Sequence, residues 1–304
     1  MKILEHKVAE DLVMMVIKKI SPACVLISEG GLGKSYLVQT LILEHCPKNS
    51  VYHTGHITPL ALYKLLYDNN DKIIVLDDME ELLANDTAIG ILKPALWQVK
   101  NKREITWGTT SEALGNYPQR FTFNGGIILL LNEIKRENHP LIQALMSRTV
   151  SHKIELTFEQ KLNIMKQILD SESFYEINEV KLSKPERERL KQDLENNVSL
   201  VTKNFNLRTL VKLVMFYSYG KKYCPENPNR YIELHNATNT IDEDKKIIIE
   251  LRDKSLPIAQ QVQQFTELTG KSRATYFRIK EKLSKDYKKP IKKTENFDYG
   301  TSRR

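Results

Sequence analysis

The chain has little cysteine and no long apolar segment. Its 304 residues include three cysteines, Cys24, Cys46 and Cys224, and no two of them have the C-x-x-C spacing of a zinc site. This odd, sparse count argues against a disulfide framework and predicts a reducing environment. No apolar stretch approaches the roughly 18 residues that cross a membrane, and the first residues lack the apolar core of a secretion signal. We therefore expect a cytoplasmic protein with no membrane partner.

The positive charge is concentrated at one end of the chain. Hydrophobic residues make up 41% and charged residues 28% of the sequence, which is typical of globular domains. The formal net charge is +8, and residues 271–304 account for all of it with twelve Lys/Arg against four Asp/Glu. A basic segment on a neutral body suggests a polyanionic partner. Residues 288–304 are predicted to be a disordered basic tail, for which simple solubilisation is the alternative.

A glycine-rich run follows the first predicted strand. Residues 28–35 read Ser-Glu-Gly-Gly-Leu-Gly-Lys-Ser, between an apolar run at 23–27 and a predicted helix at 36–44. This is the context of a phosphate-binding loop, in which backbone N–H groups and a helix N-terminus bind phosphate. Lys34 is expected to reach the β- and γ-phosphates, and Ser35 to hold Mg²⁺. The predicted nucleotide contacts are Glu29, Gly30, Gly31, Leu32, Gly33, Lys34, Ser35 and Tyr36. Ser28 departs from the usual pattern, which has glycine there.

Polar residues end two further predicted strands. Asp77 and Asp78 follow the apolar run at 72–76, and Asn132 follows the apolar run at 126–131. A carboxylate at the end of a neighbouring parallel strand faces the phosphate loop. Asp77 is expected to hold Mg²⁺ and Asp78 to act as general base on water, with Asn132 orienting that water. Helix-capping carboxylates at a strand-to-helix turn are the alternative interpretation.

Strands alternate with helices up to residue 156, which predicts an α/β fold with a parallel sheet flanked by helices. The segments at 104–107 and 120–123 are expected to pair as a hairpin. Beyond 157 the pattern is helical, and the prolines at 225 and 228 indicate a linker.

The order of these motifs resembles the AAA+ ATPase superfamily over roughly residues 1–222. The resemblance implies that the loop and the paired aspartates are the Walker A and Walker B motifs, that Asn132 is sensor 1, and that the cofactors are ATP and Mg²⁺. It also implies that Arg148 is an arginine finger reaching a neighbouring subunit of a homo-oligomer, and that Arg208 is sensor 2 in a helical lid. Asp78 replaces the glutamate that most members carry. A superfamily 3 helicase is the second interpretation.

The C-terminal part has the pattern of a helix-turn-helix. Predicted helices at 256–265 and 273–285 flank a short turn that contains Gly270, a C-cap residue, and Ser272, an N-cap residue. The expected core positions are Ile258, Val262, Phe265, Ala274, Phe277, Ile279 and Leu283. The predicted DNA contacts are Lys271, Ser272, Arg273, Thr275, Tyr276, Arg278 and Lys282. A charged helical bundle for protein contact is the alternative.

These expectations combine into five segments. They are an ATPase core (1–156), a helical lid (157–222), a linker (223–240), a helix-turn-helix domain (241–287) and the basic tail (288–304). The predicted function is ATP-driven remodelling or unwinding of DNA by an oligomer, in replication or maintenance of a mobile element. A switch that recruits partners, such as a transposition regulator or helicase loader, is the alternative.

Two sets of less specific DNA contacts are also predicted in the ATPase core. The resemblance implies a pore loop at 54–57, and the cations Lys100, Lys102, Arg103 and Arg120 flank the expected hairpin. A solvated face explains these cations equally well. His53 and His56 have ligand-like spacing, but no Cys or carboxylate accompanies them in the motif, so we do not expect a metal there.

Overall fold

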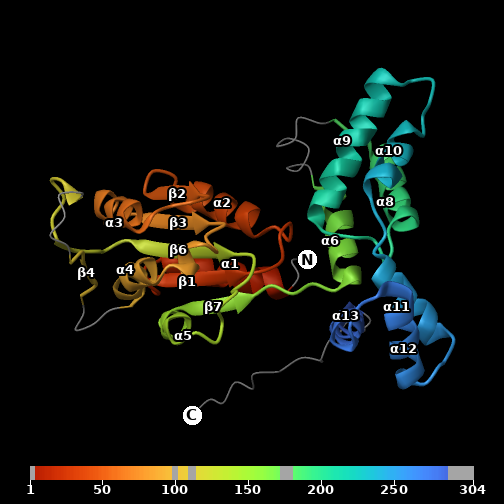
Figure 1. Ribbon diagram of the computed structural model, residues 1–304. Coiled ribbons are helices and arrows are strands. Elements are labelled where there is room, and N and C mark those ends of the chain that lie inside the picture. Colours follow the sequence, from red (N-terminus) through yellow and green to blue (C-terminus); the bar gives the residue numbers. More distant parts are fainter. Residues whose placement is uncertain (1–3, 98–101, 109–113, 172–180, 287–304) are drawn as a thin grey trace, which may run out of the picture. The chain divides into compact units, whose positions relative to one another are not determined.

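A computed structural model describes residues 4–97, 102–108, 114–171 and 181–286 of the chain (Figure 1). The chain forms two compact units. The first extends to Leu156 and includes the separate segment Asn206–Arg208, and the second comprises Thr157–Phe205 and the chain from Thr209 onward. Among the described residues, no helix has the length and apolar character needed to span a membrane.

A five-stranded parallel sheet forms the centre of the first unit. Its strand order is β2-β3-β6-β1-β7, so β6 lies between β1 and β3. The two central strands β3 and β6 are buried along their whole length, as their continuous apolar sequences predict. The strand bounds are Ala23–Ile27 (β1), Ser50–Thr54 (β2), Ile73–Asp77 (β3), Gly126–Leu131 (β6) and Val150–Lys153 (β7). The predicted α/β class with a parallel sheet is confirmed.

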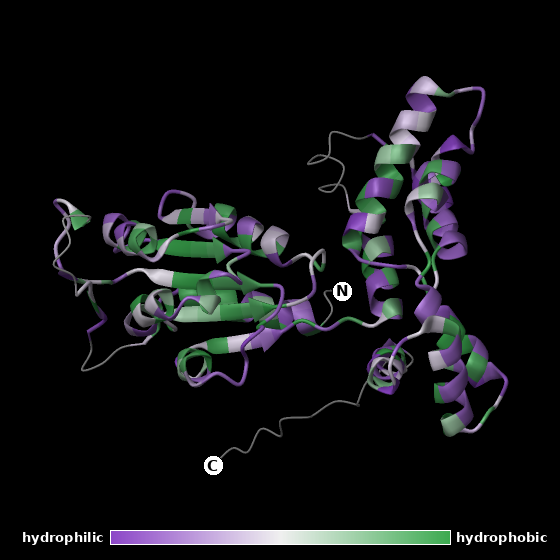
Figure 2. Ribbon diagram, in the orientation of Figure 1, coloured by the Kyte–Doolittle hydropathy of each residue, from purple (hydrophilic) through white to green (hydrophobic). Residues whose placement is uncertain are grey.

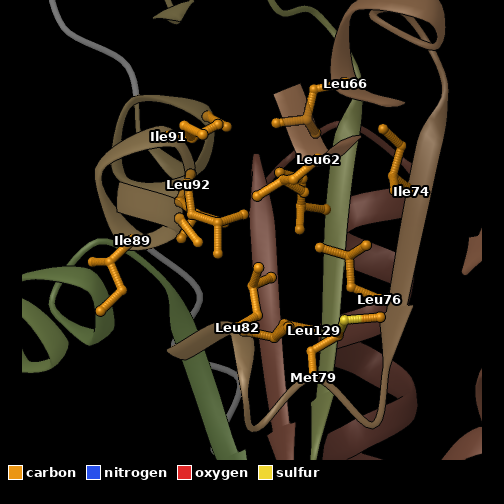
Figure 3. Close-up of a cluster of buried hydrophobic side chains, with 14 of the residues drawn as sticks. Leu62, Leu66, Ile74, Leu76, Met79, Leu82, Ile89, Ile91, Leu92 and Leu129 are labelled. Atoms are coloured by element: carbon orange, nitrogen blue, oxygen red, sulfur yellow. The ribbon is translucent and has the colours of Figure 1, made fainter. Parts of the chain in front are cut away.

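Helices cover both faces of this sheet because successive side chains of a strand point to opposite faces. Val25, Leu76 and Leu129 belong to the core cluster that α3, α4 and α5 cover (Figure 3). The helix α1 contacts β1, β6 and β7 and packs beside α2. Figure 2 shows the central strands β1, β3 and β6 as the most continuously hydrophobic part of this unit. The helix bounds are Leu4–Ile17 (α1), Lys34–His45 (α2), Pro59–Asp68 (α3), Leu82–Ala84 (η1, a 3₁₀ turn), Asp86–Leu96 (α4) and Pro140–Met146 (α5).

The expected hairpin is present as the antiparallel strands β4 (Glu104–Thr106) and β5 (Arg120–Thr122). Aromatic contacts attach it to α3, since the ring of Phe121 lies 5.2 Å from that of Tyr63 and 5.3 Å from that of Tyr67. Such edge-to-face pairs add about 0.5–1.5 kcal/mol each beyond the area they bury. The hairpin is therefore fixed to the core by packing.

Arg103, predicted as a possible DNA contact, is buried, and that prediction is wrong. Its guanidinium donates hydrogen bonds to the carbonyl oxygens of Ala95 (3.1 Å) and Gly125 (2.6 Å) and lies over the ring of Phe123. Burial lowers the pKa of this guanidinium. Arg103 thus ties the start of the hairpin to α4 and to the start of β6. Lys100 lies outside the described residues.

The second unit begins with a helical bundle. Its helices are α6 (Phe158–Asp170), α8 (Lys184–Asn197), α9 (Leu207–Tyr223, of which the first two residues belong to the first unit) and α10 (Arg230–Thr238). Capping boxes start α6 and α8. The segment predicted as a linker contains α10, whose Tyr231 and His235 are buried. Tyr231 packs against Tyr217 of α9 with ring centroids 5.0 Å apart, so this segment is part of the bundle core and the linker prediction is wrong there.

Three helices follow as a small cluster, α11 (Glu243–Asp253), α12 (Ile258–Thr269) and α13 (Arg273–Asp286). Gly270 ends α12 in the left-handed conformation, and the Ser272 hydroxyl accepts the backbone N–H of Thr275, as predicted. The predicted faces are partly wrong. Tyr276 is fully buried, and its hydroxyl donates to Oε1 of Gln261 at 2.7 Å. Phe277, Ala274 and Ile258, expected in the core, are exposed. The predicted tail at 288–304 lies outside the described residues.

Gly125 and Gly90 offer a matched test of the first unit. A Cβ added at Gly125 would lie 2.0 Å from the carbonyl oxygen of Lys72, whereas one added at Gly90 of α4 would meet nothing within 4 Å. We expect Gly125→Ala to lower the free energy of unfolding by about 1–3 kcal/mol through overpacking. Gly90→Ala should raise it by about 0.5–1 kcal/mol because alanine favours helices. Urea unfolding measures both, and shifts of the same sign would contradict the packing described.

Candidate nucleotide-binding site

The glycine-rich loop connects β1 to α2 with two residues in the left-handed region. Gly31 has φ 79° and Gly33 has φ 88°, conformations that glycine adopts without strain. The helix α2 begins immediately afterwards at Lys34, so its N-terminal N–H groups face the loop. The ring of His6, from α1, contacts the carbonyl oxygen of Leu32 at 2.8 Å. The predicted strand, loop and helix are therefore present in the expected order.

Lys34 turns back across the loop. Its Nζ donates to the carbonyl oxygen and to Oγ of Ser28, both at 2.9 Å, and to Oδ1 of Asn132 at 3.2 Å. Ser28 itself continues the strand, since its N–H donates to the carbonyl oxygen of Leu131. Its backbone is outside the left-handed region, so this position does not require glycine. The serine adds a hydroxyl that accepts a hydrogen bond from the lysine.

Asn132 connects the lysine to a carboxylate. Its Oδ1 accepts from Lys34, and its Nδ2 donates to Oδ1 of Asp78 at 2.9 Å. Its backbone N–H donates to the carboxylate of Glu80. These groups meet because β1, β6 and β3 are neighbouring parallel strands that end at the same edge of the sheet. The sequence predicted Lys34, Asp78 and Asn132 as site residues, and they form one hydrogen-bonded series.

Asp77 and Ser35 lie near one tyrosine hydroxyl. The hydroxyl of Tyr52, on β2, donates to Oδ2 of Asp77 at 2.6 Å and is close to the Ser35 side chain. Burial raises the pKa of Tyr52, and the hydrogen bond and charge of Asp77 raise it further, so the phenol stays protonated as a donor. A carboxylate and a hydroxyl in one place are the oxygen ligands that Mg²⁺ takes. The two residues predicted to hold magnesium therefore fit that ion.

The lysine lies among opposite charges. Burial lowers the pKa of Lys34, while the negative charges of Asp77, Asp78 and Glu80 raise it and the positive charge of Arg208 lowers it. The Lys34 residue is only 5% exposed, and the nearby negative charges favour its protonated form against the cost of burial. The site thus combines a desolvated cation with three anions, an arrangement that can bind a polyphosphate together with a divalent cation.

A segment distant in sequence closes one side of the loop. The N–H of Leu207 donates to the carbonyl oxygen of Gly31 at 2.9 Å. A Cβ added at Gly31 would lie only 2.6 Å from Cγ of Asn206, so the two residues are closely packed. The backbone N–H of Arg208 is capped by Oδ1 of Asn206. This segment, Asn206–Arg208, belongs to the first unit. Arg208 is exposed, and its positive charge lowers the pKa of Lys34.

Arg148 is not part of this group of residues. It follows α5, is half-buried, and donates a hydrogen bond to the carbonyl oxygen of Ala144 one turn earlier. Among the described residues, no hydrogen bond or ion pair is found between it and Lys34, Asp78 or Asn132.

Two other predicted residues also lie apart from this group. His56, in the predicted pore loop, lies 3.2 Å from the carboxylate of Glu81. Tyr36, a predicted nucleotide contact, is exposed on α2.

Sequence reasoning missed four residues around the phosphate loop. They are Tyr52, Glu80, His6 and Asn206. They come from four separate segments of the chain, which is why no local motif contains them. A hydroxyl or carboxylate near a strand end was a usable signal for Tyr52 and Glu80.

The predicted DNA contacts of the second unit have different surroundings. Lys271 is paired with Asp244, and the guanidinium of Arg273 lies 5.4 Å from the ring centre of Phe277. Ser272 and Thr275 hydrogen-bond to each other at the start of α13. Tyr276 is buried, so its predicted contact with DNA is wrong. Arg278 and Lys282 are exposed one turn apart on α13.

The tyrosine hydroxyl between Asp77 and Ser35 can be tested directly. We expect Tyr52→Phe to weaken Mg²⁺ affinity by about 10–100-fold, because groups that orient a metal ligand contribute at this level. Titration calorimetry with Mg²⁺ in the presence of a nucleotide measures it. Tyr117→Phe is the matched control, since it removes a similar hydrogen bond to Asp68 (3.0 Å) in the aromatic contacts of the hairpin. Equal affinity in the two variants would contradict this arrangement.

Comparisons with known proteins add a distant likeness of fold. Neither a protein-family model nor a curated protein sequence matches the chain. Among solved structures, it is similar to three substituted forms of RuvB from Thermotoga maritima. They are 11–13% identical in sequence, with 92% of this chain and 86–87% of those chains covered, and the TM-scores are 0.48–0.49. A likeness at this level decides neither family nor activity, so the functional argument rests on the residues of the site.

Proposed function

We propose that this protein is a magnesium-dependent ATPase of the AAA+ type that acts on DNA. The observation that carries the ATPase part is the series from Lys34 through Asn132 to Asp78, with Asp77 and Ser35 beside it. A lysine at a helix N-terminus, a water-orienting amide and two carboxylates are the groups that hydrolysis of a nucleoside triphosphate requires. An ordinary glycine turn after a strand would need none of these partners.

The proposed reaction assigns one task to each side chain. Lys34 binds the β- and γ-phosphates, where its charge offsets the charge that develops on their oxygens. Asn132 orients the attacking water, and Asp78 accepts a proton from that water as its oxygen attacks the γ-phosphorus. The bond to the bridging oxygen breaks and leaves ADP. Ser35 and Asp77 would hold Mg²⁺, which supplies further neutralisation of the phosphate charge.

The two predicted arginines have different roles in this proposal. Arg208 acts within one subunit, which is supported by the hydrogen bond from the N–H of its neighbour Leu207 to the carbonyl oxygen of Gly31 in the same chain. Arg148 is proposed to act on the site of a neighbouring subunit, so the active form is a homo-oligomer. Its lack of any described contact with its own Lys34, Asp78 or Asn132 is compatible with that role. An arginine of this kind raises the hydrolysis rate by about 10³–10⁵-fold.

DNA is proposed as the partner of the helices at the end of the second unit. Arg278 and Lys282 are exposed one turn apart on α13, which follows α12 after a short turn at Gly270. Helices of this kind enter the major groove, and cations along them bind phosphates. The excess of positive charge in residues 271–304 supports a polyanionic partner. Remodelling or unwinding of DNA in replication or mobile-element maintenance is the finer form of this proposal.

The general base is tested by two charge-removing variants. Asp78→Asn should lower the ATP hydrolysis rate by about 10²–10⁴-fold because the proton acceptor is lost. ATP affinity should stay within a few-fold, and asparagine tolerates the left-handed backbone of Asp78 (φ 57°). Glu80→Gln removes the same charge near Lys34 but keeps an acceptor for the Asn132 N–H, and it should cost less than tenfold. The reverse order of effects would make Glu80 the base.

The DNA contact is tested by the salt dependence of duplex binding. Arg278→Ala with Lys282→Ala should weaken binding and reduce the slope of log affinity against log salt by about 2, because two phosphate contacts are lost. Lys184→Ala with Lys254→Ala removes equal charge elsewhere in the second unit and should leave the slope unchanged. Equal slopes in both double variants, together with an ATPase rate that does not respond to duplex DNA, would refute the DNA assignment.

A further inference from the structure

The helix α9 is apolar on two opposite faces. One face packs into the bundle through Leu210, Leu213, Val214 and Tyr217. The other is a line of four exposed large apolar residues at i, i+4, i+8 and i+12, which we call the α9 stripe. Their exposed fractions are 38% for Val211, 60% for Met215, 49% for Tyr219 and 60% for Tyr223. Ordered exposure of this kind marks an interaction surface more often than single exposed residues do.

The two tyrosines of the stripe are next to each other. The ring centres of Tyr219 and Tyr223 are 5.3 Å apart, with an angle of 38° between the ring planes. The Nζ atom of Lys222 lies 5.0 Å from the ring centre of Tyr223. The two aromatic rings and the adjacent cation form an apolar, positively charged platform at the C-terminal end of the helix.

The charged residues of α9 itself are all basic. Residues 207–223 contain Arg208, Lys212, Lys221 and Lys222 and no acidic residue. Lys221 is paired with Glu186, whereas no ion pair of Lys212 or Lys222 is found in the described part of the chain. Of the acids on neighbouring elements, Glu186 is paired with Lys221, and Glu233 with Arg230. Glu226 is exposed three residues beyond Tyr223, so among the described residues the cations Lys212 and Lys222 outnumber the one free acid near the stripe.

We propose that the α9 stripe is a binding platform for single-stranded nucleic acid, which rests on the proposed action of this protein on DNA. Bases stack on Tyr219 and Tyr223, and Lys212 and Lys222 contact the phosphates. Stacking on aromatic rings beside cations is the general way in which single strands are bound without sequence preference. The stripe from Val211 to Tyr223 is about 18 Å long at 1.5 Å per residue.

Charge complementarity favours this occupant over a second protein surface. An apolar protein partner would bury Val211 and Met215 equally well, but it would also desolvate or leave unpaired the two lysines beside them. A nucleic acid strand supplies both the flat apolar faces and the regularly spaced anions that the platform lacks. The occupant is distinct from the duplex proposed for α13, because stacking requires bases that are not paired in a helix.

The test uses the full chain and a fluorescein-labelled oligothymidylate, with affinity measured by fluorescence anisotropy. Tyr219→Ala with Tyr223→Ala should weaken binding by about tenfold or more for each ring removed. Tyr219→Phe with Tyr223→Phe keeps both rings and should stay within about threefold of the parent protein. Lys212→Ala with Lys222→Ala should reduce the salt slope by about 1.4, the value for two phosphate contacts on a single strand.

Duplex binding, ATP hydrolysis and oligomer mass are measured on the same proteins. The inference is supported when the alanine pair loses single-strand affinity while its mass by light scattering, duplex affinity and ATPase rate are unchanged. It is overturned when single-strand affinity is unchanged in the alanine pair, or when the oligomer mass falls, which would make the stripe a subunit interface. Absence of ATP hydrolysis in the parent protein would instead refute the proposed function, whatever the stripe binds.

Discussion

The pairing of β6 with β1 on one side and with β3 on the other is the constraint on which the site depends. In this register Ile27 pairs with Leu131, and Asp77 pairs with Leu130, so the three strands end at the same level. The N–H of Ser28 continues the ladder to Leu131, which sets the start of the loop directly beside Asn132. One amide side chain can then contact both neighbours. A sheet in which β1 and β3 were adjacent would leave no such position between them.

Much of the fold follows from local sequence, and much of the site does not. The loop, α2 and the buried strands have clear patterns, and Asp77, Asp78 and Asn132 stand at predicted strand ends. The strand order could not be predicted from local sequence patterns. That order places β2 next to β3, so that Tyr52 contacts Asp77. Contacts between residues 98 apart, such as Lys34 with Asn132, depend on that order. The same limit applies to Asn206, which reaches the loop from beyond the sheet.

The wrong predictions have physical causes. An arginine is usually expected on the surface, but the guanidinium of Arg103 is buried. Two carbonyl oxygens accept its hydrogen bonds, and the ring of Phe123 lies beside it. The sequence prediction assigns the core face of α13 to Phe277 and its helical neighbours, which leaves Tyr276 outside. In the structure Gln261 satisfies the Tyr276 hydroxyl in the interior. The backbone also accounts for the aspartate at position 78, since Asp78 lies in the left-handed region, where Asp and Asn are enriched.

The amide of Asn132 joins a cation to an anion, and it can do so in only one direction. Its oxygen faces the ammonium group, and its nitrogen faces the carboxylate. Half a turn about the final side-chain bond would set donor against donor and acceptor against acceptor. An aspartate would accept from the lysine but could not donate to Asp78, and a leucine of similar shape could do neither. Position 132 therefore requires an amide, with its oxygen facing Lys34 and its nitrogen facing Asp78.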